Sequence, residues 1–344
     1  MELNVLVINV FERPTAIWLY SRNLQGIDPM HISVYDAYPK SNPVSRLKRE
    51  MEMMSDSFLG TGFLNRNIVA ANDTIIHYAD PMVPPAVDKK FLKSKLVTIF
   101  DNPKVLLSTD LYFKDSVGGR LSKKFLNKNI EKYKNFENTL VESTYVKNSL
   151  IDFGFLGSID VIYLPISPSF RPLGDKYNLR RKLNLPQDSK LILSVSTDIK
   201  RKNLNLIERA MKNMNDNIKL VRVGKPLGNS ITFSNISNEI LNELYNSCDV
   251  LVMPSLEEGF GLPIIEALAT GLPVVASDIE VFHEIGGEAL EYVNPMSVES
   301  LISGIENSIA NGENKSKEAK IFIEKYSYDR FKRNMLQYYM KLLK

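Results

Sequence analysis

Residues 250–277 read VLVMPSLEEGFGLPIIEALATGLPVVAS, and this stretch decides the fold class of the chain. Four apolar residues precede Pro254, a pattern typical of a short strand that is buried on both faces of a parallel sheet. Pro263 suits the first position of a helix, because the proline ring presets φ and its missing N–H costs nothing there. Gly271 ends this predicted helix, and the apolar run after it supplies the next strand. The stretch therefore predicts a strand, loop, helix and strand, which is the βαβ unit of a doubly wound α/β domain.

Two glutamates lie around the loop of this unit. In open α/β sheets, ligands bind beyond the carboxyl ends of the strands, and Glu258 falls there with Glu266 on the helix that follows. Gly259 and Gly261 let the loop backbone approach a ligand closely. The alternative is a solvated loop charge at Glu258 and an acid near the start of a helix at Glu266, where the macrodipole favours it. Two glutamates at this spacing alone would favour the solvated alternative. The residues around them favour a single pocket that both glutamates line.

A second group of polar residues follows the predicted strand at residues 191–195. Arg201 and Lys202 stand where this strand passes into a helix. A departing diphosphate needs positive charge and N–H donors, and arginine can chelate phosphate oxygens while lysine adds a compact charge. A solvated basic turn is the alternative. Because parallel strands deliver their carboxyl ends to the same edge of a sheet, we expect these cations beside Glu258.

Composition and charge exclude several classes of protein. The 344 residues are 44% hydrophobic and 24% charged, as in ordinary globular proteins, and they suffice for two domains. The single cysteine excludes an internal disulfide, and no segment resembles a signal peptide or an apolar membrane span, so we predict a cytoplasmic protein. A net charge of only +3 argues against nucleic acid as the main partner.

Strand and helix candidates alternate along the chain, as expected of two doubly wound domains. The proline-rich segment that begins at Pro165 is the best boundary, so we predict one domain at residues 1–168 and a second at residues 169–328. A mixed basic and apolar helix is predicted near the end of the chain, within residues 329–344. Further strands are predicted at residues 3–10, 32–35, 74–77, 96–100, 138–141, 161–164 and 219–223, and further helices at residues 123–134, 145–153 and 238–247.

The string that starts at Pro254 and ends at Ser277 resembles the donor-site signature of retaining, nucleotide-sugar-dependent glycosyltransferases of family 4, also called glycosyl transferases group 1. Residues 191–204 resemble the strand and basic turn of the same family, and residues 163–170 resemble its crossover between domains. The resemblance implies the GT-B fold, in which two Rossmann-like domains face each other across a cleft. It also implies that the first domain binds the acceptor, that the second binds the donor and that the terminal helix packs back on the first domain.

The resemblance implies roles for single residues as well. Arg201 and Lys202 would bind the donor diphosphate, Glu258 would contact the sugar, and Glu266 would accept hydrogens from the ribose hydroxyls. The loop amides near the sugar and phosphate would be those of Gly259, Phe260, Gly261 and Leu262. Family members work without a metal ion, and no acidic pair of the kind that holds one stands on a loop here.

The chain departs from the family pattern at two places. Where many members have glycine and arginine after the strand, this chain has Ser196 and Thr197, and Thr197 is the candidate donor contact there. The family's histidine at the end of a first-domain strand is replaced by Phe100, which leaves Asp101 as the nearest candidate for a catalytic group. His77 could offer another imidazole, and a structural histidine is the alternative.

The implied function is retaining transfer of a sugar, without cofactor or metal, from a UDP- or GDP-sugar to a hydroxyl of a glycan or lipid-linked acceptor. An epimerase or hydrolase of the same fold and a catalytically silent sugar-nucleotide-binding subunit remain alternatives. A nicotinamide-dependent oxidoreductase is disfavoured because no predicted strand is followed by GxGxxG. Basic segments at residues 89–95 and 119–128 suit either a peripheral contact with the inner face of a membrane or solvated helix faces.

Overall fold

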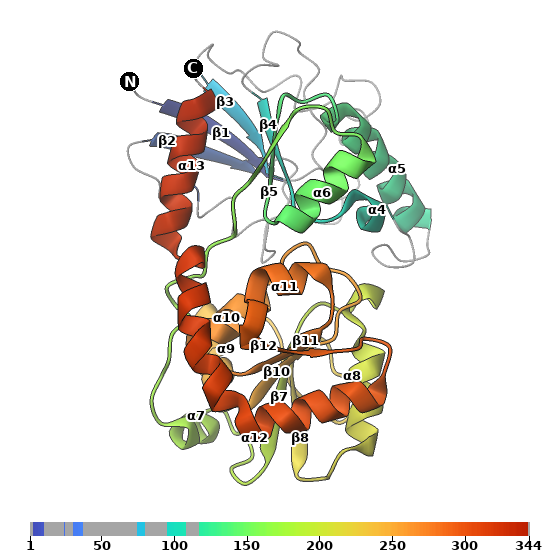
Figure 1. The fold of residues 1–344 in the computed structure, drawn as a ribbon, viewed down its shortest axis with the longest axis vertical. Coiled ribbons are helices and arrows are strands. Elements are labelled where there is room, and N and C mark those ends of the chain that lie inside the picture. The colour runs from blue at the N-terminus through green and yellow to red at the C-terminus, as the bar shows by residue number, and fades with distance from the viewer. Residues whose placement is uncertain are drawn as a thin grey trace, which may run out of the picture. The chain divides into compact units, whose positions relative to one another are not determined.

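The computed structural model describes residues 3–9, 24, 30–36, 74–79, 95–107 and 117–342. The chain divides into two compact units, Met1–Leu164 with Asp329–Lys344 and Pro165–Tyr328. Each unit is built on a parallel sheet flanked by helices (Figure 1). None of the helices in the described part of the chain is long and apolar enough to cross a bilayer.

The sheet of the first unit has the strand order β2-β1-β3-β4-β5-β6, and all of its described pairings are parallel. Its described strands are β1 (Leu3–Asn9), β2 (Met30–Asp36), β3 (Thr74–Tyr78), β4 (Lys95–Ile99), β5 (Asn138–Val141) and β6 (Ser158–Val161). The helices that follow β4 and β5 are α4 (Pro103–Leu106), α5 (Val117–Tyr133) and α6 (Thr144–Phe153). Three rings in this core, Tyr78, Tyr133 and Phe136, pack edge to face with centroids 4.9–5.9 Å apart.

The last helix of the chain, α13 (Tyr328–Leu342), belongs to the first unit, where Figure 1 shows it beside the sheet. Its Tyr339 hydroxyl lies 2.6 Å from Nδ1 of His77 on β3. Nε2 of the same imidazole lies 2.6 Å from the hydroxyl of Thr98 on β4. Burial lowers the pKa of His77 to about 3, so the ring is neutral at ordinary pH. His77 is therefore a buried residue that links α13 to the sheet.

The second unit has the strand order β12-β11-β10-β7-β8-β9, again all parallel. Its strands are β7 (Lys190–Val195), β8 (Ile218–Val223), β9 (Ile231–Phe233), β10 (Val250–Met253), β11 (Val274–Ser277) and β12 (Leu290–Val293). Its helices are α7 (Lys176–Lys182), α8 (Leu204–Asn213), α9 (Asn238–Ser247), α10 (Leu262–Thr270), α11 (Glu280–Gly286) and α12 (Val298–Ile323). The chain builds outward from β7 on one side and then from β10 on the other, so the topological switch point lies between these two strands.

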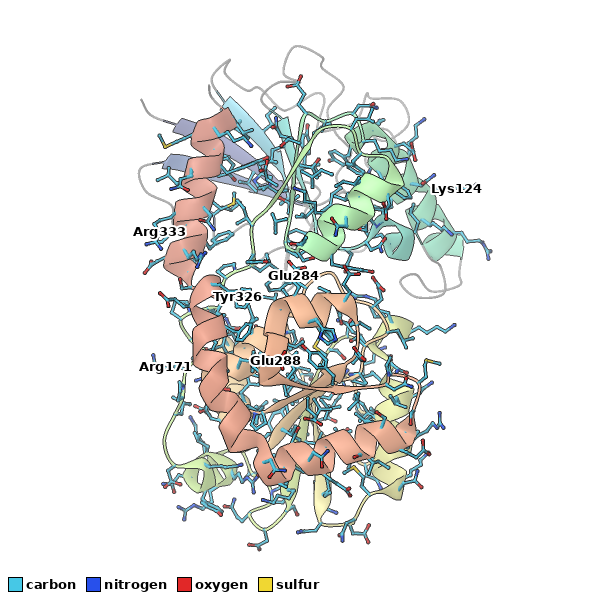
Figure 2. The ribbon with its side chains drawn as sticks, in the orientation of Figure 1. Lys124, Arg171, Glu284, Glu288, Tyr326 and Arg333 are labelled. Atoms are coloured by element: carbon cyan, nitrogen blue, oxygen red, sulfur yellow. The ribbon has the colours of Figure 1, made fainter. Side chains whose placement is uncertain are left out.

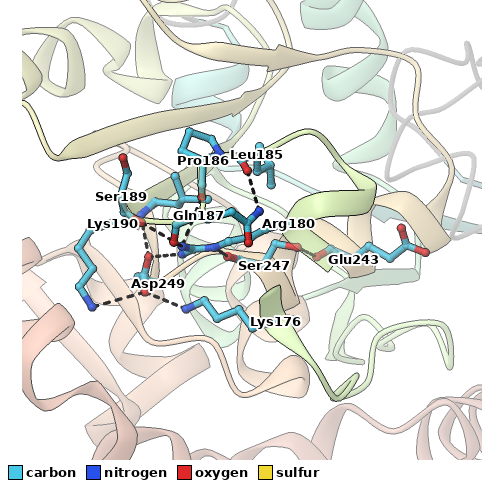
Figure 3. Close-up of polar contacts among 11 residues, drawn as sticks. Lys176, Arg180, Leu185, Pro186, Gln187, Ser189, Lys190, Glu243, Ser247 and Asp249 are labelled. Carbon is cyan, nitrogen blue, oxygen red and sulfur yellow. Dashed lines mark hydrogen bonds and ion pairs between the residues drawn. The ribbon is translucent and has the colours of Figure 1, made fainter. Parts of the chain in front are cut away.

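An ion-pair network joins α7 to the amino ends of β7 and β10 (Figure 3). Asp249, just before β10, pairs with Arg180 at 2.7 Å and with Lys176 at 2.8 Å, and it accepts from the backbone N–H of Leu191 at 2.7 Å. Arg180 also donates to the carbonyls of Gln187 and Ser189, among others, which lie in the loop between α7 and β7. This network lies at the sheet edge opposite the carboxyl ends of the strands, so it stabilises the unit away from the predicted site.

Most predicted elements are confirmed within one or two residues, but two differ, and other helices and strands were not predicted. The strand expected at residues 161–164 lies at 158–161 instead, because β6 is an edge strand whose exposed face takes Ser158 and Asp160 rather than a continuous apolar run. Helix α5 starts at Val117, six residues before the expected start, although two glycines with low helix propensity follow. Helix α12 was not predicted, because its middle is a long polar stretch without an apolar period.

Of the two basic segments, residues 119–128 lie within α5, where Arg120, Lys124 and Lys128 are exposed, and Figure 2 shows Lys124 on the outside of that helix. Residues 89–94 of the other segment lie outside the described residues, and its last residue, Lys95, begins β4.

Candidate active site

The loop between β10 and α10 has the tight geometry that its glycines predict. Gly261 caps the helix with φ +118°, and a Cβ there would lie 3.1 Å from the ring of Phe282. A residue with a side chain would therefore be both strained and crowded at this position. Pro263 is the second residue of α10, within the first turn where its missing N–H costs nothing, and Gly271 ends the helix with φ +84°. The backbone of this loop is thus set at the carboxyl end of β10.

Glu258, in the loop between β10 and α10, accepts hydrogen bonds from three side chains. Its carboxylate accepts from Arg201 Nη1 and from Lys202 Nζ, each at 2.5 Å, and from the Ser255 hydroxyl at 2.7 Å. The Glu258 residue is only 5% exposed. The expected meeting of the two cations with Glu258 is therefore present in the structure, across the switch point between β7 and β10.

The ionisation of Glu258 is determined by two opposing effects. Burial raises the pKa of the carboxyl, but the charges of Lys202 and Arg201 and the hydrogen bonds from Lys202 and Ser255 outweigh burial and lower the pKa to about 2. Glu258 is therefore an anion throughout the physiological range, and it offsets one of the two positive charges of Arg201 and Lys202. It is suited to hydrogen-bond acceptance and not to proton donation.

Asn203 connects the loops that follow three strands, and sequence reasoning did not single it out. It adopts the left-handed conformation (φ +54°) after the 3₁₀ turn Lys200–Lys202, and its side-chain amide donates to the carbonyls of Pro254 at 3.0 Å and Pro295 at 2.8 Å. The N–H of Leu256 donates to the Arg201 carbonyl at 2.8 Å. Asparagine tolerates this backbone conformation, which is the one local signal that marks the position.

Glu266 lies on α10 and is held by a residue of α9. The hydroxyl of Tyr245, a fully buried side chain, donates to Glu266 Oε2 at 2.8 Å. Burial raises the pKa of the half-buried Glu266 to about 7, although the hydrogen bond from Tyr245 opposes this rise. The ring of Phe170 packs edge to face on Tyr245 with centroids 5.8 Å apart. Tyr245 is a second residue of the site that only the structure reveals.

The side chain of Phe260 packs into the second unit. It is 4% exposed and meets the ring of Tyr326 edge to face, with centroids 5.6 Å apart. The Tyr326 hydroxyl donates to the carbonyl of Ile285 at 2.7 Å, and the neighbouring Lys325 donates to the carbonyl of Glu284 (Figure 2). Phe260 can therefore contact a ligand only through its backbone, and the same kind of contact is open to the backbone of Gly259 and Leu262.

The remaining predicted residues take no part in the hydrogen bonds of this group. Thr197 is exposed where β7 ends and takes no part in the hydrogen bonds that join Arg201, Lys202 and Glu258. Asp101 belongs to the first unit, where it is half-buried just beyond the end of β4. His77 has both ring nitrogens within hydrogen-bond distance of hydroxyls inside that unit, which makes it a structural residue.

Comparison with known proteins finds a family that the second unit resembles. Residues 175–326 match the family described as glycosyl transferases group 1. The O-antigen chain mannosyltransferase RfbU of Salmonella typhimurium is 38% identical over 107 residues, which are 31% of this chain and 30% of RfbU. The chain thus spans less than a third of the length of this curated relative.

Solved structures match the whole chain. The sucrose-phosphate synthase of Thermosynechococcus elongatus aligns with a TM-score of 0.79 and 18% identity over 99% of both chains. HepE of Anabaena, solved in complex with UDP and glucose, aligns with a TM-score of 0.72 and 13% identity over 98% of this chain and 99% of HepE. The chain therefore has the GT-B fold, and its residues 175–326 match the glycosyl transferases group 1 family.

Proposed function

We propose that this chain is a retaining glycosyltransferase of family 4, which moves a sugar from a nucleoside diphosphate sugar to an acceptor hydroxyl without a metal ion. The observation that carries the proposal is the Glu258 carboxylate held between Arg201 and Lys202 at the switch point of the second sheet. Ligands of doubly wound folds bind at this point. Both cations reach it from the loop after β7, and the carboxylate reaches it from the loop after β10.

The two cations serve the departing diphosphate in this proposal. The bond between the anomeric carbon and the diphosphate oxygen breaks, and its electron pair leaves with the nucleoside diphosphate. The acceptor oxygen bonds to the anomeric carbon on the same face, and its proton passes to a diphosphate oxygen. Arg201 and Lys202 stabilise the charge that develops on the leaving group, which lowers the barrier. Asp101 is the first-unit candidate that orients the acceptor hydroxyl.

In this proposal the ribose and the phosphates of the donor bind at the same sheet edge. A carboxylate at Glu266 accepts both ribose hydroxyl hydrogens, and a buried acceptor left unpaired costs about 1–3 kcal/mol, which favours a nucleotide over an analogue without the diol. The N–H groups from Gly259 to Leu262 stand at the start of α10, where a helix favours negative charge. Thr197, at the end of β7, adds a donor contact on the diphosphate side.

UDP-sugars and GDP-sugars are both donor candidates, and the complex of HepE with UDP makes a UDP-sugar the first to test. The name of RfbU adds mannose to the sugars that a panel should contain. For the acceptor we propose a glycan or a lipid-linked glycan, made at the cytoplasmic side of a membrane. The exposed Arg120, Lys124 and Lys128 on α5 support a peripheral contact with anionic lipid, worth about 1 kcal/mol for each cation near the surface.

A thermal-shift panel tests the donor site. UDP, GDP and their glucose and mannose conjugates are added with and without Mg²⁺, and a ligand at 100 times its Kd should stabilise the protein by about 2.7 kcal/mol. We expect stabilisation that does not need Mg²⁺. If none of these nucleotides raises Tm, the donor-site proposal is wrong.

Transfer is tested with the donor that binds. Lys202→Met should abolish release of the nucleoside diphosphate, while Lys212→Met, which removes an exposed cation from α8 of the same unit, should leave it unchanged. Product formation that requires an added acceptor separates a transferase from a hydrolase or an epimerase, and the anomeric proton of the product shows whether configuration is retained. Full activity of Lys202→Met would refute the role given to this cation.

A further inference from the structure

Arg222 is a fully buried charged side chain at the carboxyl edge of the second sheet. It lies on β8 directly beside Ser194 of β7. Its Nη1 donates to the carbonyls of Ser194 at 3.1 Å and Val223 at 2.6 Å, and its Nη2 donates to the carbonyl and hydroxyl of Ser196 at 2.6 and 3.2 Å. All four acceptors are neutral, and two of them belong to the first residue after β7.

No carboxylate in the described part of the chain forms an ion pair with Arg222. The acid that acts on it through space, Asp198, is itself paired with the exposed Lys225 at 3.1 Å. Arg201 and Lys202 differ, since both are bonded to Glu258. Burying a charge costs several kcal/mol unless it is hydrogen-bonded and compensated. Arg222 is hydrogen-bonded, but no paired carboxylate among the described residues offsets its positive charge.

The contacts of Arg222 also determine which way the next peptide group points. In a planar trans peptide, the C=O and the following N–H point in opposite directions. Because the Ser196 carbonyl points at the guanidinium, the N–H of Thr197 points away from it. Among the described residues, none accepts a hydrogen bond from this N–H, and Thr197 itself is exposed.

A glycine, Gly224, packs against the contact between Arg222 and the Ser196 carbonyl. Gly224 has φ +141°, and a Cβ at this position would lie 2.5 Å from the Ser196 carbonyl oxygen and 2.9 Å from Arg222 Nη2. Any side chain there would have to displace the carbonyl or the guanidinium. The arrangement of Arg222, Ser196 and Thr197 therefore depends on this one small residue.

We propose that Arg222 is a positioning residue for the donor diphosphate: it holds the Ser196 carbonyl, presents the N–H of Thr197 to a phosphate oxygen and places a buried positive charge behind that loop. The inference rests on the proposed function and extends it, because no arginine stands directly after β7 and the charge comes from the neighbouring strand instead. The group it recognises is the diphosphate, so its contribution should be absent for a nucleoside.

Paired titrations of a nucleoside diphosphate and its nucleoside test the proposal. The probes are UDP with uridine, or GDP with guanosine if wild type binds GDP, measured by calorimetry and by ligand-observed NMR for the weaker nucleoside. Arg222→Met should weaken UDP binding at least tenfold and leave uridine binding within twofold of wild type. Arg222→Lys should restore part of the loss, because it returns the charge without the planar fork. Equal loss for UDP and uridine would show a merely structural role, and unchanged UDP binding would overturn the proposal.

Gly224→Ala repeats the test with Arg222 in place, should Arg222→Met not fold. We expect the same selective loss of UDP affinity, because the added Cβ displaces the Ser196 carbonyl. Gly228→Ala is the matched control, since Gly228 also has positive φ but a Cβ there meets its first neighbour at 3.9 Å. UDP binding of Gly224→Ala equal to that of Gly228→Ala would overturn the proposal. A folded wild type that binds neither UDP nor GDP would instead refute the donor site itself.

Discussion

Glu266 combines a ligand-binding position with a pKa near neutrality. Folding raises its pKa from the ordinary 4.5 to about 7, so its contribution to stability is complete below pH 4.5 and is lost as the pH rises to about 7. A diol donates two hydrogens and binds the carboxylate form. Affinity for the donor sugar nucleotide should therefore rise from about pH 5.5, by up to about tenfold per pH unit, and become constant above about pH 7.5.

Glu266→Gln is the control for this prediction, since an amide cannot ionise. Titrations of the UDP- or GDP-sugar that wild type binds should show a constant affinity for the variant over the same pH range. A diester donor is used because its phosphates do not titrate there, unlike those of a free nucleoside diphosphate. The same pH dependence in wild type and variant would exclude Glu266 from the ribose contact.

Tyr245 opposes the rise in the pKa of Glu266 through its hydrogen bond. In Tyr245→Phe the midpoint of the pH dependence of donor affinity should move to higher pH. The free energy of unfolding should fall by about 1 kcal/mol, because one hydrogen bond is lost. Tyr292→Phe is the matched control, because that hydroxyl donates to the carbonyls of Phe282 and Gly287 and does not touch Glu266. It should lose similar stability without moving the midpoint. An unchanged midpoint in Tyr245→Phe would mean that the tyrosine only fills space.

At the scale of elements, the attachment of α7 to the second sheet depends on Asp249. Asp249→Asn leaves the guanidinium of Arg180, whose side chain is 4% exposed, without a countercharge. Removing one partner of a buried pair costs about 3–5 kcal/mol, which urea unfolding can measure. Asp198→Asn, which breaks the exposed pair with Lys225, should cost less than about 1 kcal/mol. Equal effects of the two changes would contradict the structural role of the network.

The attachment of α13 to the first sheet should depend on pH through His77. Folding lowers its pKa from 6.5 to about 3, so the stability it contributes is complete above 6.5 and is lost as the pH falls toward 3. Wild type should lose about 2 kcal/mol between pH 6.5 and pH 5 relative to His77→Gln, which does not titrate. The other two histidines are present in both proteins, so the comparison isolates His77. Parallel unfolding curves at both pH values would contradict this assignment.

At the scale of the whole molecule, the proposed donor contacts of Arg201, Lys202, Glu258 and Glu266 all belong to the second unit, whereas Asp101 belongs to the first. We therefore expect a protein made of residues 165–328 to bind the nucleoside diphosphate within tenfold of the affinity of the full chain. It should transfer no sugar, because it lacks the first unit. Calorimetry and a donor-consumption assay measure the two properties, and loss of nucleotide binding from the folded fragment would show that the first unit contributes to the donor site.

The local sequence predicted strands β7, β8, β10 and β11 and helices α9 and α10 of the second unit, and it predicted the site residues Arg201, Lys202 and Glu258. A strand such as residues 250–253 is marked by its own apolar residues, and the ends of the next helix are marked by Gly261 and Gly271. These signals lie within a few residues of each other, so the local sequence is enough to predict the elements. The rule that parallel strands share an edge then brought Arg201 and Lys202 to Glu258. The search for apolar runs misplaced edge strand β6, because this strand is partly exposed and contains polar residues.

The sequence by itself thus determined a doubly wound α/β architecture and the charged residues at one sheet edge, because backbone preferences and strand direction suffice for both. The tertiary structure alone decided that Tyr245 holds Glu266, that Asn203 connects three loops and that Arg222 lies beneath Ser196. These contacts join residues between 21 and 92 positions apart. Their physical cause is burial in the folded unit, where each polar group must find a partner that no local pattern specifies.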